Sequence, residues 1–172
     1  QEQSRNLIQT DYVLPIGKNT QFEAGYQGNF VKNTTDYSVV RNGIPFPQFT
    51  NTLEYKEKVN ALYTQFGTKF NKLSMLYGLR WEDSNIDVNQ LATNEFNNKK
   101  YNNFFPSAFF TYELSETSDA SISYSKRIQR PRGRQLNPFN NLSSNVNIFI
   151  GNPDLNPAYT DAFDLGYLKK WS

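Results

Sequence analysis

Apolar and polar residues alternate along seven segments of the chain. In residues 20–31, for example, Phe22 and Tyr26 share one parity, whereas Gln21 and Glu23 share the other. The same alternation is present in residues 5–14, 57–70, 73–86, 104–114, 119–129 and 160–171. A period of two gives a β-strand one apolar and one polar face. The pattern therefore predicts seven β-strands.

The connections between these segments alternate between short and long. The short ones are residues 15–19, 71–72 and 115–118, and the long ones are approximately residues 32–56, 87–103 and 130–159. Strands that run up and down in sequence would place all short turns at one end and all long loops at the other. Long structureless loops are uncommon in compact soluble domains, whereas transmembrane β-barrels have this asymmetry. The predicted fold class is all-β, an antiparallel up-and-down transmembrane β-barrel.

Aromatic residues agree with a membrane-spanning sheet. They make up 16% of the 172 residues, and 37% of all residues are hydrophobic. Trp81 falls near the long-loop end of its segment and Trp171 at the short-turn end of its own, as expected for two aromatic girdles. We expect one set of apolar-parity side chains to point toward lipid: Phe22, Tyr26, Tyr77, Leu79, Phe110, Tyr112, Ile122, Tyr124, Leu165 and Tyr167. Because no apolar run reaches about 18 residues, the sequence predicts no transmembrane helix.

Seven strands cannot close an ordinary single-chain bacterial barrel, which has an even number of strands. Open strand edges in lipid are costly because their backbone groups stay unpaired. Equivalent aromatic positions recur about every 50 residues, at Tyr12, Tyr63, Tyr112 and Phe163. At that spacing a barrel of about 22 strands would take roughly 550 residues. We therefore interpret residues 1–172 as a partial barrel domain that supplies about a third of a larger wall and includes neither a plug domain nor a signal peptide.

Several chemistries have no support in the composition. The chain has no Cys and no His, which removes thiol nucleophiles, thiolate metal sites and His-based catalysis. The net charge of +2 is too small to indicate a nucleic-acid partner. Asp83-x-Asn85-x-Asp87 resembles the start of a calcium loop, but Val88 replaces the required Gly and Asn94 the bidentate Glu. We expect no enzymatic activity, no cofactor and no metal site.

Candidate ligand contacts lie in and before the last long connection. A basic cluster comprises Lys126, Arg127, Arg130, Arg132 and Arg134, and an Asn-rich stretch that includes Asn140, Asn141 and Asn145 follows. The cluster is either a solvated strand end or a surface that attracts lipopolysaccharide or an anionic substrate. The candidate contacts are Arg130, Arg132, Arg134, Asn140, Asn141 and Asn145. Other charges have the polar parity and are expected to face the barrel lumen: Asp11, Glu23, Arg80, Glu82, Glu113 and Arg127.

Two sequence blocks together resemble a known family. SYSKRIQRPRGRQLNPF (residues 123–139), followed by GNPDLNPAYTDAFDLGY (residues 151–167), is similar to the barrel of TonB-dependent outer-membrane receptors of Bacteroidetes-type bacteria, in the branch called the outer-membrane β-barrel family. The stretches at residues 4–26 and 77–83 resemble it too. The resemblance implies a 22-stranded barrel, an N-terminal plug and uptake of a nutrient powered through TonB. It also implies several partners: outer-membrane lipid, the rest of the barrel and its plug, TonB through other segments, and a surface lipoprotein or other envelope complex.

The repeated Asn-Pro pairs in the second block have a structural interpretation. Proline fixes φ and disfavours a helical residue before it. Pro138, Pro153 and Pro157 are therefore expected to hold the ends of the long loop and to set the register of the last strand. We favour this role over direct contact with a ligand.

Two further functions stay open alongside nutrient import. One is a structural outer-membrane barrel, or one associated with secretion or adhesion. The other is a soluble all-β ligand-binding module that binds carbohydrate through its aromatic residues. The substrate is equally open, since siderophores, glycans, peptides and cobalamin all use similar barrels.

Overall fold

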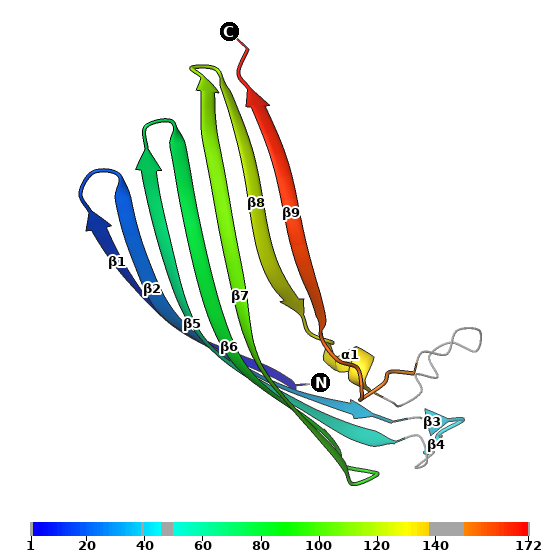
Figure 1. Ribbon diagram of the computed structural model, residues 1–172. Coiled ribbons are helices and arrows are strands. Elements are labelled where there is room, and N and C mark those ends of the chain that lie inside the picture. The colour runs from blue at the N-terminus through cyan, green and yellow to red at the C-terminus, as the bar shows by residue number, and fades with distance from the viewer. Residues whose placement is uncertain (1, 39, 46–49, 138–149, 172) are drawn as a thin grey trace.

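Seven long strands form one antiparallel sheet in chain order (Figure 1). The computed structural model describes residues 2–38, 40–45, 50–137 and 150–171. The strands of this sheet are β1 (Glu2–Ile16), β2 (Thr20–Tyr37), β5 (Asn51–Phe70), β6 (Leu73–Gln90), β7 (Glu95–Ser115), β8 (Ser118–Gln129) and β9 (Ala158–Lys169). The prediction of seven antiparallel strands is confirmed. The sheet is curved and is not closed into a barrel.

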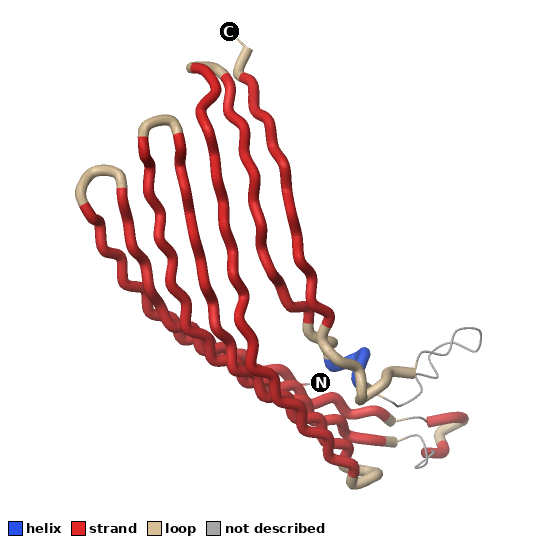
Figure 2. Tube along the Cα trace, viewed as in Figure 1, coloured by secondary structure: helices blue, strands red, loops and turns tan. Residues whose placement is uncertain are grey.

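All three predicted short turns lie at the same end of the sheet, at the top of Figures 1 and 2. They connect β1 to β2, β5 to β6 and β7 to β8. In the turn at residues 71–72, Asn71 has a φ of 52°. This left-handed conformation suits a two-residue hairpin, and Asn tolerates it better than most residues. The up-and-down arrangement is therefore confirmed.

The opposite end holds three connections, and two of them are shorter than predicted. The first was expected at residues 32–56, but β2 continues to Tyr37 and β5 starts at Asn51. The first contains a small hairpin of β3 (Val40–Arg41) and β4 (Ile44–Pro45), and the third contains the short helix α1 (Gly133–Leu136). The predicted long loop at residues 87–103 is wrong. β6 continues to Gln90 and β7 starts at Glu95, so only residues 91–94 form the turn.

The strands continue because the alternation continues with its phase reversed. We call the side of the sheet that carries Phe22, Leu79 and Leu165 the outer face, and the opposite side the inner face. On β6 the outer face is apolar up to Trp81 and then carries Asp83 and Asp87. Beyond that point, the apolar side chains of β6 lie on the inner face. A search for a single apolar parity therefore ends the strand too early.

The ten side chains predicted to share a face do so. The strand register places all of them on the outer face. The apolar part of this face spans residues 62–70 on β5, 73–81 on β6 and 104–114 on β7. Stretches of about 9–11 residues match a tilted strand that crosses a hydrocarbon layer. None of the helices in the described part of the chain is long and apolar enough to cross a membrane.

Aromatic side chains with hydrogen bonds mark the loop-side edge of this apolar band. Tyr26 donates to Asn60 over 2.8 Å and Tyr124 to Asp161 over 2.8 Å. Trp81 Nε1 likewise donates to the amide oxygen of Asn102. Each aromatic ring thus lies on the apolar side of its polar partner, which is the arrangement that amphipathic rings favour at an interface.

Pairing between β7 and β8 stops part-way along the strands. The last register pair is Ser107 with Ser125, and Pro106 is the next residue of β7 toward the loops. Proline has no backbone N–H to continue the ladder. Residues 95–106 therefore pair only with β6 in the described structure, and β8 continues beside β9 alone.

Candidate functional site: a polar network and an inward-folded strap

A polar network crosses the inner face from β1 to β6. The Tyr63 hydroxyl donates to the Asp11 carboxylate, and the Arg80 guanidinium lies 5.8 Å from the centre of the Tyr63 ring. Arg80 also donates to Gln27 over 2.8 Å and to Glu82 over 2.6 Å. These contacts join side chains from four strands, so that the charges on this part of the inner face are satisfied within the sheet.

The network depends on close approach at one glycine. Gly25 stands directly opposite Tyr63 in the register. A Cβ atom at position 25 would overlap the Tyr63 ring. The absence of a side chain at Gly25 therefore allows the ring to lie across β2 and reach Asp11.

Arg130 connects the network to the segment between β8 and β9. Its guanidinium donates to the Glu82 carboxylate and, over 2.7 Å, to the Ser84 hydroxyl. Its Nε lies 3.8 Å from Glu57, which in turn accepts a 2.9 Å hydrogen bond from the Tyr55 hydroxyl. The side chain of Arg130 is only 17% exposed. A charge buried to this extent needs paired carboxylates, and β5 and β6 provide them.

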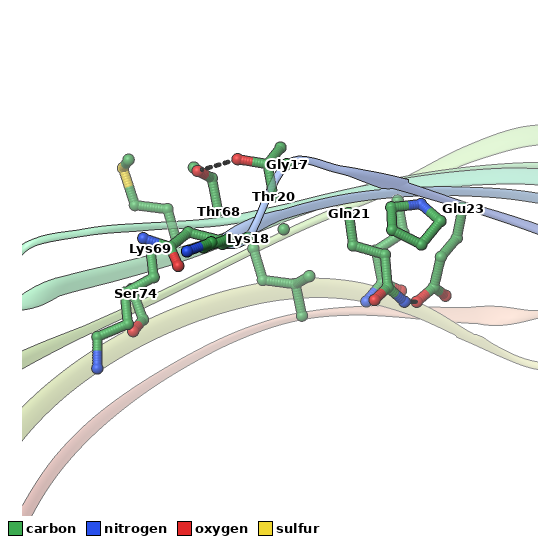
Figure 3. Close-up of a pocket in the computed structure, with 14 residues that line it drawn as sticks. Gly17, Lys18, Thr20, Gln21, Glu23, Thr68, Lys69 and Ser74 are labelled. Atoms are coloured by element: carbon green, nitrogen blue, oxygen red, sulfur yellow. Dashed lines mark hydrogen bonds between the residues drawn. The ribbon is translucent and has the colours of Figure 1, made fainter.

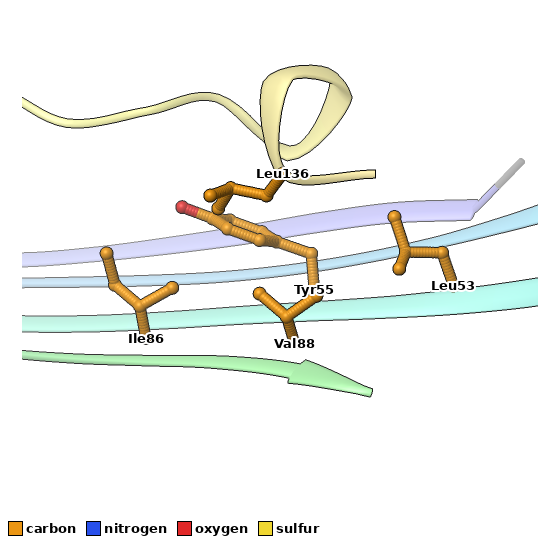
Figure 4. Packing of buried hydrophobic residues seen from close by; sticks show 5 residues of the cluster. All are labelled: Leu53, Tyr55, Ile86, Val88 and Leu136. Carbon is orange, nitrogen blue, oxygen red and sulfur yellow. The ribbon is translucent and has the colours of Figure 1, made fainter. Parts of the chain in front are cut away.

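We call residues 130–137 and 150–157 together the inner strap. Its helix α1 lies over the loop ends of the strands, where Leu136 packs on Tyr55 and its neighbours (Figure 4). The apolar cluster consists of Leu53, Tyr55, Ile86, Val88 and Leu136. Leu136 is 2% exposed, and complete burial of a leucine contributes about 1.5–3 kcal/mol. The strap thus covers the apolar part of the inner face.

Backbone hydrogen bonds join the two halves of this strap, residues 130–137 and 150–157. The Gly151 N–H donates to the Asn137 carbonyl over 2.7 Å, and the Asn152 N–H donates to the Gln135 carbonyl over 2.7 Å. A Cβ at Gly151 would lie 2.5 Å from both carbonyl oxygens. Only glycine fits this approach without displacement of the backbone. These contacts hold Gly151 against the first half of the strap, while the role of the prolines stays a prediction.

The second half of the strap also reaches β7. Asn97 donates to the Asp154 carboxylate over 3.2 Å, and the Lys99 ammonium donates to the Leu155 carbonyl over 2.9 Å. Both residues of β7 lie on the inner face, beside the strand edge that β8 leaves unpaired. The strap is thereby attached to β5, β6 and β7. Pro153 and Pro157 belong to it, while Pro138 lies outside the described residues.

The predicted ligand contacts have different positions in the structure. Arg130 is not a solvated charge at the rim, because Glu82 and Ser84 bind it against the sheet. Arg132 is exposed just before α1, and its contact with a ligand stays a prediction. The Arg134 side chain lies outside the described structure, as do three further candidates: Asn140, Asn141 and Asn145.

All six charges predicted to face the lumen have their side chains on the inner face by register. Arg80 and Glu82 belong to the polar network, and Glu23 accepts a 2.5 Å hydrogen bond from Gln21. Arg127 is exposed, and its Nε donates to the Ser125 hydroxyl over 3.3 Å. Arg127 thus differs from Arg130 in having no carboxylate beside it.

The Asp83-x-Asn85-x-Asp87 pattern lies in a strand, where alternate residues follow one another along the outer face. The Asn98 amide donates to Asn85 over 2.7 Å and to Asp87 over 2.5 Å. In the part of the chain that the structure describes, no group of three or more His, Cys, Asp or Glu residues could hold a metal.

Among the hollows of the described structure, two border the inner-face polar side chains of β2, β5 and β6. One of about 540 Å³ lies at the short-turn end and includes Lys18, Glu23 and Lys69 in its lining (Figure 3). The other, of about 310 Å³, borders the polar network at Tyr63 and Arg80. Both offer hydrogen-bonding groups, and their chemistry suits contact with another polar surface or a polar solute.

Sequence reasoning missed several residues of the strap contact and of the polar network. They are Tyr55, Glu57, Ser84 and Leu136 at the strap and Tyr63 in the network. A signal was present, because Leu53, Tyr55, Ile86 and Val88 alternate with the opposite parity to Leu62 and Trp81. The reversal shows that the inner face gains an apolar cover beyond the membrane-level segment, but the identity of that cover requires the tertiary structure.

The sequence model of the outer membrane protein beta-barrel family matches residues 1–172, the whole chain. The chain belongs to this family. The protein therefore lies in the bacterial outer membrane, and its apolar outer face contacts lipid. The alternative of a soluble all-β module is wrong, because a soluble module would not belong to a family of membrane barrels.

Among solved structures, the chain is similar to the ferric citrate transporter FecA in its unliganded form, with a TM-score of 0.53. The match covers 73% of this chain and 21% of the FecA chain, at 15% sequence identity. The chain thus spans about a fifth of that transporter, and the similarity at this identity concerns the fold. No curated protein matches this outer-membrane barrel chain in sequence.

Proposed function

We propose that residues 1–172 form part of the barrel wall of a TonB-dependent receptor that imports a nutrient across the outer membrane. The observation that carries this proposal is the inner strap. Arg130, Leu136 and Lys99 attach it to the inner face at the loop end. A connection folded inward narrows a barrel at its entrance, which suits controlled uptake of a chosen ligand better than free diffusion.

The fold similarity to a transporter and the two sequence blocks at residues 123–139 and 151–167 support the same proposal. The whole protein would have about 22 strands, a plug inside the barrel and a TonB-contacting segment, all supplied by further residues, in a receptor of the Bacteroidetes type. Its substrate would be a siderophore, glycan, peptide or similar nutrient, and a surface lipoprotein is a candidate partner. The protein would transport its ligand without chemical change.

The experiment uses the full-length gene in its own host. Cells with and without the gene are compared for uptake of a panel of labelled siderophores, oligosaccharides, peptides and cobalamin, before and after collapse of the proton gradient. The expected result is loss of uptake of one class upon deletion, with restoration by the gene and dependence on the gradient. Gene-dependent uptake that persists without the gradient would indicate a passive barrel. If deletion changes no uptake but impairs secretion or adhesion, the result would favour a barrel associated with secretion or adhesion.

A further inference from the structure

At the loop end, the inner strap covers one part of the inner face and leaves another part open. The inner strap covers β5, β6 and β7, as Leu136, Arg130 and Lys99 show. Within residues 121–129 and 158–166, the inward side chains of β8 and β9 are small apart from Arg127, Asp164 and Gln129: Ser121, Ser123, Ser125, Ala158, Thr160, Ala162 and Gly166. A solute that moves along this wall would therefore meet Arg127 as its only long cationic side chain among the described residues of β8 and β9 on that face.

Among the described residues, the charge of Arg127 has no acidic partner. None of the ion pairs among the described residues includes it. All 16 acidic residues of the sequence fall within the described ranges, so residues 138–149 contribute no carboxylate. Arg127 stands directly opposite Thr160, whereas Asp164 stands opposite Ser123, four positions along β8. That separation is roughly 13 Å along the strand, beyond the Debye length of about 8 Å at physiological salt.

The contrast with Arg130 makes this arrangement informative. Three positions separate the two arginines, yet Arg130 is bound by Glu82 and lies near Glu57. Both oxygens of Glu82 are already engaged, one by Arg80 and the other by Arg130. On the outer side, Asp161 stands opposite Lys126 and accepts from Tyr124. The nearby carboxylates are thus already engaged, and the Arg127 guanidinium is left facing the interior.

We propose that Arg127 is a specificity-determining residue, which meets a carboxylate or phosphate group of the ligand as it passes along the β8–β9 wall. The inference rests on the proposed import function and adds a substrate class, that of anionic ligands. A guanidinium binds either group through two parallel hydrogen bonds. The small neighbours Ser125 and Thr160 leave space at its side and supply hydroxyl groups.

The test measures the local charge with thiol reagents in the full-length protein. Because residues 1–172 contain no Cys, Thr160→Cys places a thiol opposite Arg127, where side chains of a cross-strand pair lie about 5 Å apart. The full-length protein without this thiol gives the background. Labelling rates are compared for an anionic methanethiosulfonate, the sulfonatoethyl reagent, and a cationic one, the trimethylammonioethyl reagent. Arg127→Gln should lower the anionic-to-cationic rate ratio about 3–10-fold at low salt, and high salt should reduce this difference.

Ser121→Cys provides the matched control. It lies on the same face of β8, six positions from Arg127, so Arg127→Gln should leave its rate ratio unchanged. An unchanged ratio at Thr160→Cys would overturn the proposal, since a group from elsewhere then neutralises Arg127. Labelling at Ser121→Cys together with no labelling at Thr160→Cys would overturn it as well, since the wall is then covered at this level.

Competition with inorganic phosphate and with succinate distinguishes the two anion classes. At an ionic strength matched with chloride, phosphate or succinate should slow anionic labelling of Thr160→Cys, and Arg127→Gln should remove that effect. If neither anion slows labelling more than chloride does, the assignment of an anionic ligand is wrong. The outcome is separable from the transport test, because uptake that proves passive would refute TonB-dependent import and leave the Arg127 measurement intact.

Discussion

The membrane-level and loop-end halves of β5 and β6 have opposite polarity. At membrane level the outer face presents Leu62 and Leu79 to lipid, while Gln65 and Arg80 face inward. At the loop end the outer face carries Lys56 and Asp87, while Tyr55 and Val88 lie buried under Leu136. A single strand therefore meets apolar surroundings on opposite sides at its two ends. Lipid is the apolar partner of one half, and the inner strap is that of the other.

This comparison explains why the inner strap belongs to the wall. Without it, Leu53, Tyr55, Ile86 and Val88 would face water on the inner side. The strap removes that apolar surface from water. The sheet in turn buries Leu136 and places two carboxylates near Arg130. We therefore expect the halves to respond differently to the same kind of substitution.

The largest effect is expected where lipid is the partner. Leu79→Arg places a charge on the outer face within the apolar segment of β6, and should destabilise the full-length barrel by about 2–3 kcal/mol. Asn85→Arg is the matched control, since it lies on the same face of the same strand, beyond the apolar segment, and should change stability little. Urea titration of folding in lipid vesicles measures both. Equal destabilisation by the two variants would contradict the division of the strand into halves.

The next effect concerns the apolar partner at the loop end. Leu136→Ala leaves a cavity over Tyr55 and should lower the free energy of strap opening by about 2 kcal/mol. This value is near the lower limit for a buried leucine, because the strap can move to fill part of the cavity. Hydrogen exchange at residues 130–137 should accelerate by roughly 30-fold, while strand amides at membrane level keep their protection. Leu155→Ala, at a residue of the strap that is 38% exposed, is the control. Unchanged exchange in Leu136→Ala would mean that the cluster does not hold the strap.

A smaller effect is expected from the polar attachment. Glu82→Gln keeps the shape of the side chain but removes the charge between Arg80 and Arg130, and should loosen the strap by about 1–2 kcal/mol. The effect should persist in high salt because partly buried pairs are screened weakly. Glu54→Gln, which alters a less buried pair with Lys56 at 3.6 Å, serves as the control. Hydrogen exchange across 130–137 in low and high salt decides between them, and equal effects of the two variants would refute a special role for Glu82.

The smallest effect is expected at the short-turn end. Lys69 and Glu113 form a 2.5 Å ion pair on exposed side chains. Exposed pairs contribute little to stability because water and salt screen them. Glu113→Gln should therefore leave the urea midpoint of the full-length barrel indistinguishable from that of the wild type. A clear loss of stability would show that this end is buried against another part of the protein.

The sequence predicted the strands and their faces better than their lengths. Phe22, Leu79 and Leu165 were assigned correctly to one face, because an uninterrupted period of two leaves little choice. Val88 was assigned to one loop and Tyr55 to another, because their apolar parity is opposite to that of the membrane-level residues of the same strands. A non-helical segment before β9 was also predictable from Pro153 and Pro157, but the contact of Gly151 with Asn137 and Gln135 was not.

The candidate site was only partly predictable for a related reason. The inner-face position of Arg80, Glu82 and Arg127 follows from parity alone. The difference between Arg127 and Arg130 does not, since both are arginines in the same basic run. Arg130 lies beyond the end of β8, where parity gives no direction, and its carboxylate partners lie 48 and 73 positions away in sequence at Glu82 and Glu57.

By itself, the sequence determined the local properties of this protein: an antiparallel sheet with tight turns at one end, an apolar outer face of membrane-spanning length, and a proline-rich segment before the last strand. These follow from backbone geometry and from the periodic placement of side chains, which act over a few residues. Only the tertiary structure decided that the inner strap lies on the inner face, that Leu136 covers Tyr55, and that Glu82 binds Arg130 while Arg127 has no carboxylate beside it. Such contacts depend on which distant segments the sheet brings together, and their free energy comes from burial and charge pairing that no local pattern contains.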